Sequence, residues 1–248
     1  MVVLIHEGFE PFIKICERIN CPKSYVGLVI RDLSQLSVML IVNEGGIEFM
    51  GIKLLGKGQN GFVFKCLVGN SYYACKVRRF DSSRPSLANE GYYLGLANSV
   101  GVGPRLINYT SNVIVMELIE GVTFDTYINY ASPNDVRLII KDLLWQCRRL
   151  DRIGLAHNEL SRSREHIIVS GNKAYIIDFE SASVNSKVSN VSQLLNALIM
   201  GKGYVQNRVR SIMNIGNNLD DLRYAIKEYK VRRDDESFIE ILKLLGLQ

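Results

Sequence analysis

From Gly56 to Val63 the chain reads GKGQNGFV, and this stretch decides how the sequence around it is interpreted. Two expected strands flank it, Ile47–Leu55 and Phe62–Val68, whereas a dinucleotide-binding G-x-G-x-x-G would open a helix. A glycine-rich hairpin with a trailing valine is typical of loops that cover nucleotide phosphates, because backbone amides approach phosphate oxygens where no Cβ intervenes. Read alone, the stretch fits a structural hairpin with bulges better. The phosphate-loop interpretation assigns contacts to Gly56, Gly58, Gly61 and Val63.

Two charged residues favour the phosphate-loop interpretation. Lys76 comes thirteen residues after Val63 at the end of an expected strand, where an ammonium suits the α- and β-phosphates of a nucleotide. Glu90 comes fourteen residues later, on the apolar face of a helix expected from Ser83 to about Asn98. An unpaired buried charge is costly, so Glu90 needs a partner, and Lys76 is the predicted one.

The second half of the chain carries three fragments in an order typical of phosphoryl transfer. They follow a long amphipathic helix that is opened by Ser132-Pro133. The fragments are HNEL from His157 to Leu160, HIIV from His166 to Val169 and IIDF from Ile176 to Phe179. Each is unremarkable alone, but in this order they match a catalytic loop and a metal loop. Glu159 is the predicted base or orienting group for an acceptor hydroxyl, and Asp178 is the predicted Mg²⁺ ligand.

Together these motifs resemble the protein kinase superfamily over about Phe49 to Met200. The runs ELS at 159–161 and DFESAS at 178–183 are similar to small atypical kinases of archaea, predicted serine/threonine kinases related to the RIO and lipopolysaccharide-kinase-like branches. The resemblance implies ATP and Mg²⁺ as cofactors. It also implies a hinge before Gly121, with Met116 behind the adenine and the backbone at Glu117 and Ile119 hydrogen-bonding the base. An edge strand that runs into a turn explains this segment equally well.

The resemblance and the order of expected elements predict an α+β, bilobal, protein-kinase-like fold. We expect an N-terminal extension over residues 1–48, an antiparallel β N-lobe over 49–118 and an α-helical C-lobe over 119–248. The extension holds two expected helices, Phe9–Ile19 and Lys23–Ser34, and a hairpin of Val38–Val42 with Ile47–Leu55. A small winged-helix-like unit and an extension packed on the next lobe both fit this pattern, and the second is preferred.

Three departures from the kinase pattern bear on activity. Glu159 stands where kinases have aspartate, and its extra methylene moves the carboxylate by about 1 Å, enough to lower a rate strongly. Arg164 stands where kinases have a metal-binding asparagine, so His166 becomes a candidate metal ligand, although a structural histidine fits equally well. No APE motif follows Asp178, and only about a dozen mostly polar residues precede the helix expected at Val191. The peptide-docking platform is therefore short or missing.

The composition is that of a folded globular protein, with 47% apolar and 22% charged residues. The net charge of +5 mildly favours polyanionic partners, so RNA or a ribonucleoprotein joins the candidate partners. The apolar run Tyr25–Val42 is broken by Arg31 and Asp32, and no secretory signal is recognised, so no membrane association is expected. Five cysteines without metal-site spacing favour reduced thiols and a cytoplasmic location.

ATP-dependent phosphotransfer to serine or threonine, on a protein partner or on the chain itself, is the favoured function. A RIO-like ATPase or nucleotide switch on an RNA–protein assembly is an alternative, supported by the basic charge and the missing peptide platform. A nucleotide-binding pseudokinase scaffold is motivated by Glu159 and the absent asparagine, and small-molecule kinases of the aminoglycoside type share the fold. The identity of the acceptor is not encoded in any recognisable motif.

Overall fold

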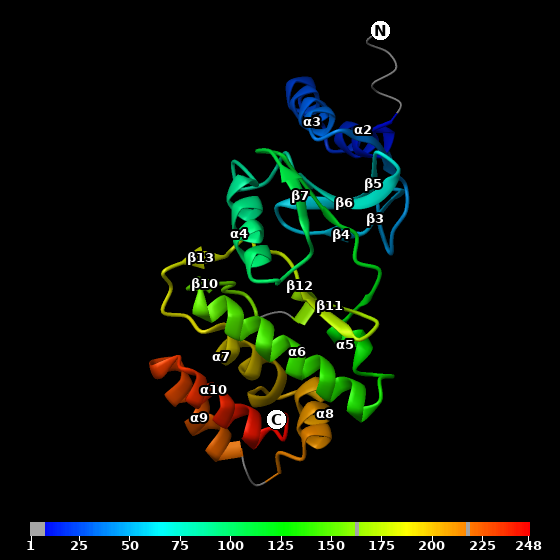
Figure 1. Ribbon diagram of the computed structural model, residues 1–248. Helices are drawn as coiled ribbons and strands as arrows, with labels where there is room; N and C mark the ends of the chain where they lie inside the picture. The colour runs from blue at the N-terminus through cyan, green and yellow to red at the C-terminus, as the bar shows by residue number, and fades with distance from the viewer. Residues whose placement is uncertain (1–7, 162–163, 217–218) are drawn as a thin grey trace. The chain divides into compact units, whose positions relative to one another are not determined.

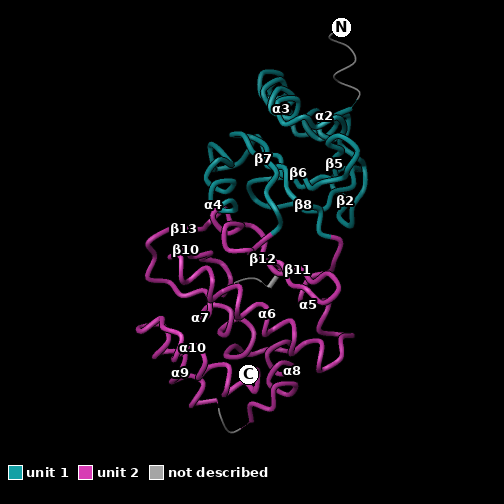
Figure 2. The backbone as a smooth tube through the Cα atoms, viewed as in Figure 1, with its two compact units in different colours: residues 1–95, 104–119 teal, residues 96–103, 120–248 magenta. Residues whose placement is uncertain are grey.

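The computed structural model of the protein describes residues 8–161, 164–216 and 219–248. They form two compact units (Figure 2). Unit 1 runs to Gly95 and includes Pro104–Ile119, and unit 2 comprises Leu96–Gly103 and Glu120–Gln248. Unit 1 is mainly antiparallel sheet and unit 2 mainly helix, which confirms the predicted α+β kinase-like fold. The domain limits placed after residues 48 and 118 stay predictions.

Unit 1 is built on a six-stranded antiparallel sheet (Figure 1). The strand order is β1-β5-β6-β8-β7, and β4 also pairs with β5. The strands are β1 Val38–Val42, β4 Gly56–Lys57, β5 Gly61–Val68, β6 Ser71–Arg78, β7 Leu106–Tyr109 and β8 Val113–Glu117. Gly69 turns the central β5–β6 hairpin with a φ of 57°, a left-handed conformation that glycine adopts without a Cβ penalty. This hairpin sets Val63 opposite Lys76.

Two helices that precede the sheet share its core. They are α2, Glu10–Arg18, and α3, Lys23–Gln35. Phe12 of α2 is buried in one apolar cluster with Ile41 of β1. On α3, Asp32 accepts hydrogen bonds from Thr110 Oγ1 at 2.8 Å and Asn112 Nδ2 at 2.9 Å, which ties the helix to the β7–β8 turn. The helices therefore pack on the sheet of unit 1, and the assignment of residues 1–48 to a separate extension stays a prediction.

The strand pairing predicted for the hairpin in the extension is wrong. Ile47–Leu55 is not one strand paired with β1, but a hairpin of its own, β2 (Ile47–Phe49) with β3 (Ile52–Leu54). Met50 and Gly51 turn this hairpin with φ values of 51° and 68°. A methionine rarely adopts positive φ, so the sequence carries little sign of the turn. β1 instead pairs with β5 of the main sheet.

Helix α4, Ala88–Ser99, begins five residues later than Ser83, because the chain from there to Ser86 forms bends and Ser86 Oγ accepts the Ala88 amide at 3.0 Å. The helix packs closely on the sheet at Gly91. A Cβ built there would lie 2.4 Å from the ring Cγ of Tyr109 on β7. Glycine at 91 is therefore what allows α4 to approach β7.

Gly91→Ala is expected to lower the free energy of unfolding by about 1–3 kcal/mol, because either α4 or the Tyr109 ring must move. The better helix propensity of alanine, about 1 kcal/mol, offsets part of this cost. Gly95→Ala is the matched control on the same helix, since its Cβ would make an ordinary 3.5 Å contact with Leu106. Urea unfolding should show Gly95→Ala as neutral or stabilising. Equal losses in both variants would contradict the close approach at Gly91.

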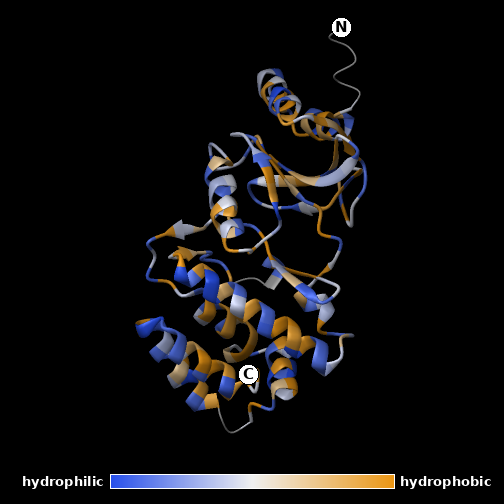
Figure 3. Cartoon of the chain, in the orientation of Figure 1, coloured by the Kyte–Doolittle hydropathy of each residue, from blue (hydrophilic) through white to orange (hydrophobic). Residues whose placement is uncertain are grey.

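Unit 2 is organised around α6, Pro133–Arg152. The Ser132 hydroxyl caps it by accepting the Asp135 amide at 3.2 Å, and proline occupies the first turn, as the sequence predicts. Most of its buried residues are apolar, from Val136 to Leu150, and Figure 3 shows hydrophobic and hydrophilic residues alternating along the helix. The other helices are α5 Phe124–Tyr127, α7 Asn190–Leu195, α8 Tyr204–Met213, α9 Leu219–Arg232 and α10 Asp235–Leu244.

Two small sheets complete unit 2 and carry its loops. One has the order β12-β11-β9 and the other is the pair β10-β13. The strands are β9 Val122–Thr123, β10 Leu155–Ala156, β11 Ile167–Ser170, β12 Lys173–Ile176 and β13 Ser183–Val184. None of the described helices has the length and apolar composition of a membrane span.

The prediction of reduced cysteines is wrong for two of the five. A disulfide joins Cys66 of β5 to Cys75 of β6, whereas Cys16, Cys21 and Cys147 are free. The β5–β6 register sets Cys66 opposite Tyr73, so the cysteines lie diagonally across neighbouring strands with a Cα separation of 6.0 Å. Cysteine chemistry therefore no longer supports a reducing, cytoplasmic location.

Candidate active site

The residues predicted to form the site divide between the two units. Those assigned to the nucleotide lie in unit 1: Gly56, Gly58, Gly61, Val63, Lys76, Glu90, Met116, Glu117 and Ile119. Those assigned to the acceptor hydroxyl and to the metal lie in unit 2: Glu159, His166 and Asp178.

The glycine loop joins β4 to β5 and is tied to the end of β6. The Gly58 amide donates to Gly61 O at 2.9 Å, and Arg79 Nη1 donates to Gly58 O at 3.2 Å. The Arg79 amide also donates to Asn60 O at 2.9 Å. A Cβ at Gly61 would lie 3.0 Å from Lys76 Cγ, so the absence of a side chain at Gly61 leaves room for the side chain of Lys76. The loop is thus a built feature that adjoins Lys76.

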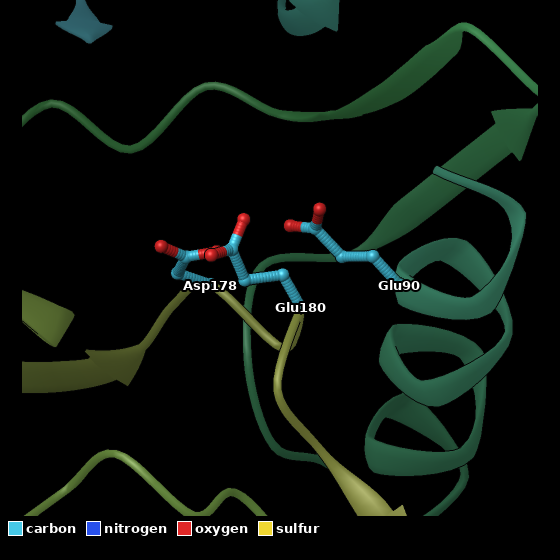
Figure 4. A group of neighbouring side chains, drawn as sticks. All are labelled: Glu90, Asp178 and Glu180. Atoms are coloured by element: carbon cyan, nitrogen blue, oxygen red, sulfur yellow. The ribbon is translucent and has the colours of Figure 1, made fainter. Parts of the chain in front are cut away.

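Lys76 and Glu90 form a buried ion pair inside unit 1. Lys76 Nζ lies 2.8 Å from Glu90 Oε1, and each side chain is only 7% exposed. Glu90 extends from α4 as Figure 4 shows. The expected partnership of these two residues is present, although their roles toward a nucleotide stay predictions. The cost of desolvating two charges means that such a pair contributes little net stability to the fold. A functional role is therefore the better explanation for its presence.

The hinge residues occupy the end of β8 and the segment beyond it. Met116 pairs with Ala74 of β6, and Met116, Glu117 and Ile119 are all half-buried. The Glu117 amide donates to Arg105 O at 2.8 Å, and the Glu117 carboxylate accepts the Arg105 amide at 2.9 Å. The amide of Glu117 is therefore engaged within the unit, so an adenine donor from this segment has to come from another residue.

His166 lies between the two carboxylates singled out in unit 2. Its Nε2 is 3.7 Å from Glu159 Oε2, and its Nδ1 is 3.7 Å from Asp178 Oδ2. It ends a single 3-10 turn, Arg164–His166, and β11 begins at the next residue, Ile167. The fold thus brings the three residues together, and an imidazole separates two acidic groups.

Asp178 and Glu180 extend from the segment that follows β12 (Figure 4). A carboxylate oxygen of one lies within 4.8 Å of a carboxylate oxygen of the other. Neighbouring carboxylates favour a shared cation, and Mg²⁺ prefers oxygen donors. The donor set fits Mg²⁺ through these two residues better than through the imidazole of His166. Glu180 was not assigned as a ligand from the sequence, and the only sign of such a role is its place two residues after Asp178.

The loop that bears Glu159 is held by a buried polar network. Asn190, at the start of α7, donates from Nδ2 to Asp151 Oδ1 and to Leu155 O, both at 2.8 Å. Its Oδ1 accepts the His157 amide at 2.9 Å. Sequence reasoning missed Asp151 and Asn190. A carboxylate within the apolar stripe of α6 is a sign that Asp151 is buried and hydrogen-bonded.

Two residues of these loops hold a left-handed backbone, which costs of order 1–3 kcal/mol for a residue other than glycine. Asn158 has a φ of 71°, and Asp178 a φ of 68°. Asn158 Nδ2 donates to Ser181 O at 2.7 Å and to Ser183 Oγ at 2.9 Å, which stabilises its conformation. Asparagine and aspartate tolerate this region best. Strained residues of this kind gather at functional sites, and here Asn158 directly precedes Glu159 and Asp178 is the predicted metal ligand itself.

His157 is fully buried against Phe179, with ring centroids 5.0 Å apart. Its Nε2 lies 2.9 Å from Ile177 O, and a carbonyl only accepts, so Nε2 carries the proton. Among the described residues, no group hydrogen-bonds its Nδ1. Burial lowers the pKa of His157 from 6.5 to about 4, against the opposing effect of the hydrogen bond that its ring donates to Ile177 O. The ring is therefore neutral near pH 7.

This burial predicts a loss of stability in acid. Between pH 6.5 and pH 4 the unfolded chain binds a proton at His157 that the folded chain does not, so the free energy of unfolding falls as pH falls. The full effect is about 3 kcal/mol. His157→Gln removes this titration, so urea unfolding at several pH values should show a flatter acid limb than in wild type. Parallel curves would contradict a neutral buried ring.

The segment after the metal loop is short, as the missing APE motif predicts. β13, Ser183–Val184, pairs with β10, and Ser189 caps α7 by accepting the Ser192 amide at 3.2 Å. Helix α7 begins at Asn190, one residue before the expected start. Little chain is thus left between Glu180 and α7 to build a peptide-docking platform.

Comparison with known proteins adds a family assignment to this geometry. Residues 71–199 match the family model of the RIO domain, slightly more than half of the chain. The match includes Lys76, Glu90, Glu159, His166 and Asp178 and begins after the glycine loop. The chain is also similar to "Uncharacterized protein MJ1211" of Methanocaldococcus jannaschii, with 28% identity over 116 residues, which are 46% of this chain and 98% of that protein.

Proposed function

This chain belongs to the RIO domain family, an atypical protein kinase family, and from that premise we propose that it transfers the γ-phosphoryl group of ATP to serine or threonine with the help of Mg²⁺. The acceptor lies on a partner protein or on the chain itself. The observation that carries the proposal is the buried ion pair of Lys76 and Glu90. Phosphoryl transfer needs a fixed positive charge at the phosphates, and a lysine oriented by a glutamate supplies it.

The chain's own groups divide the work of the transfer. The acceptor oxygen attacks the γ-phosphorus, the bond to the bridging oxygen breaks, and ADP leaves with the bonding electrons. Glu159 takes the hydroxyl proton, while the ammonium of Lys76 holds the α- and β-phosphates. The amides between Gly56 and Gly61 cover the phosphates, and Val63 and Met116 line the base with the backbone of Ile119.

In this proposal Asp178 and Glu180 hold Mg²⁺, which neutralises phosphate charge when it is bound. His166 was predicted as a further ligand, and its position supports a different role. With one ring nitrogen toward Glu159 and the other toward Asp178, the imidazole holds the two carboxylates apart in fixed orientations. We therefore assign it to positioning.

A RIO-like ATPase or nucleotide switch is the second candidate, and a specific observation favours it. The chain between Glu180 and α7 is short and partly consumed by β13, which leaves little surface for a peptide. The net charge of +5 suits an RNA–protein assembly as the partner. The proposal includes a cytoplasmic location, because the phosphoryl donor is a nucleoside triphosphate.

Incubation with γ-labelled ATP tests these functions. With Mg²⁺ we expect label in protein, and none when EDTA replaces the metal. Label in inorganic phosphate alone would favour the ATPase. Stabilisation by ATP in a thermal melt without any turnover would favour a pseudokinase scaffold. If the protein neither binds nor consumes ATP, the assignment of ATP as its ligand is wrong.

A further inference from the structure

A cavity of about 540 Å³ lies within unit 2, beside the turn that follows Glu159. Its walls come from α5, from the turn at Ser161, from the π-helical turn Asn196–Met200 and from the start of α8. Helices α5 and α8 both belong to unit 2 (Figure 2). The polar side chains that line it include Asp125, Asn129, Ser161, Asn196, Lys202 and Tyr204. Its volume is in the range of ligand sites in proteins.

The cavity has a fixed position relative to Glu159. Leu160, between Glu159 and Ser161, is fully buried, and its amide donates to Gln193 Oε1 of α7 at 3.2 Å. The turn is thus anchored to a helix rather than free to swing. Ser161, which lines the cavity, is two residues along the chain from Glu159, the carboxylate that is proposed to take the acceptor proton.

The irregular wall of the cavity is held by specific hydrogen bonds. A π-helical turn leaves carbonyls unpaired, and such turns are frequent at functional sites. Here Arg210 Nη1 donates to Ile199 O at 2.8 Å and to Gly201 O at 3.2 Å. The buried Gln206 donates from Nε2 to Ala197 O at 2.6 Å. Gly203 has a φ of 158° where the chain turns into α8, a backbone conformation that residues with a Cβ rarely adopt.

The chemistry of the lining indicates what the cavity takes. It presents one carboxylate, Asp125, and one ammonium, Lys202, among neutral amides and hydroxyls. Its charge is balanced, unlike the basic grooves that bind nucleic acid. Amides that both donate and accept match a peptide backbone. Tyr204, 62% exposed, adds an aromatic face on which a side chain can pack.

We propose that this cavity is the acceptor subsite, and that it binds a short neutral segment of a protein whose serine or threonine enters at the Ser161 end. This inference rests on the proposed phosphotransferase function. It explains how a chain with a short segment between Glu180 and α7 still recognises a peptide, because α5 and the start of α8 replace the missing platform.

The test uses the full chain, ATP, Mg²⁺ and a library of short peptides that each carry one serine or threonine between degenerate flanks. Tyr204→Ala removes an aromatic side chain from the lining of the cavity, and Asn196→Trp fills the cavity. Each variant should lower peptide phosphorylation at least about tenfold at subsaturating peptide. The loss should appear in KM for peptide, while stabilisation by ATP in a thermal melt is retained. Tyr224→Ala is the matched control, since Tyr224 is 66% exposed on α9 outside this cavity.

Each outcome decides between the two proposals. Wild-type rates in both cavity variants would overturn the subsite. A wild-type chain that binds ATP with Mg²⁺ but modifies no peptide in the library would overturn the peptide as substrate class. Failure of the wild-type chain to bind ATP would instead refute the function on which the subsite rests.

Discussion

Lys76→Met is expected to abolish phosphotransfer and to lower the free energy of unfolding by about 3–5 kcal/mol. Methionine has nearly the length of lysine and fills its path beside Gly61, so the change removes charge rather than volume. It also takes away the ammonium that lies 2.8 Å from the buried carboxylate of Glu90. The rate should fall at least about 100-fold, the usual cost of losing one preorganised charge at a transition state.

A double variant separates the structural effect from the catalytic one. Lys76→Met combined with Glu90→Gln removes both buried charges, so it should recover most of the stability and none of the activity. Lys65→Met is the matched control on the same hairpin, because Lys65 pairs with the exposed Glu44 and should matter by less than about 1 kcal/mol. Urea unfolding and label transfer measure the two effects. A double variant as active as wild type would refute the role of Lys76.

Elements with a strong local pattern were predictable, and their partners were not. The apolar stripe of α6 and its Ser132 cap specify a helix without help from the rest of the chain. The run Val38–Val42 specifies a strand, but alternation indicates a face and not a neighbour. β1 therefore pairs with β5 instead of the next strand along the chain, since the core that α2 and α3 share with the sheet requires it.

The candidate site was predictable where chemistry requires a residue type at a set position. Lys76 and Glu90 stand at the positions that the order of motifs predicts, and the fold joins them in an ion pair. Asn190 was not predictable, because a side chain that hydrogen-bonds backbone groups leaves no periodic sign. The disulfide of Cys66 with Cys75 was within reach of the sequence, because the Gly69-Asn70 hairpin already brings its two strands together.

Asp178→Asn is expected to remove the dependence of ATP binding on Mg²⁺ and to lower phosphotransfer at least about 100-fold. Asparagine keeps the size of the side chain and tolerates the φ of 68° at this position, so the loop should keep its shape. The substitution also removes one of two carboxylates whose oxygens lie within 4.8 Å, so stability should hold or rise. Thermal melts with ATP, at increasing Mg²⁺, measure the binding.

Two further variants make the metal assignment decisive. Asp178→Ala lacks the carboxylate too, but alanine tolerates positive φ poorly, so it should lose about 1 kcal/mol more stability than asparagine while losing the same function. Asp220→Asn, at a carboxylate 89% exposed on α9, controls for a general change in charge. If Mg²⁺ still strengthens ATP binding in Asp178→Asn as in wild type, Asp178 is not the ligand. A response that then disappears in Glu180→Gln would move the metal to Glu180, because that carboxylate is the neighbouring oxygen donor in unit 2.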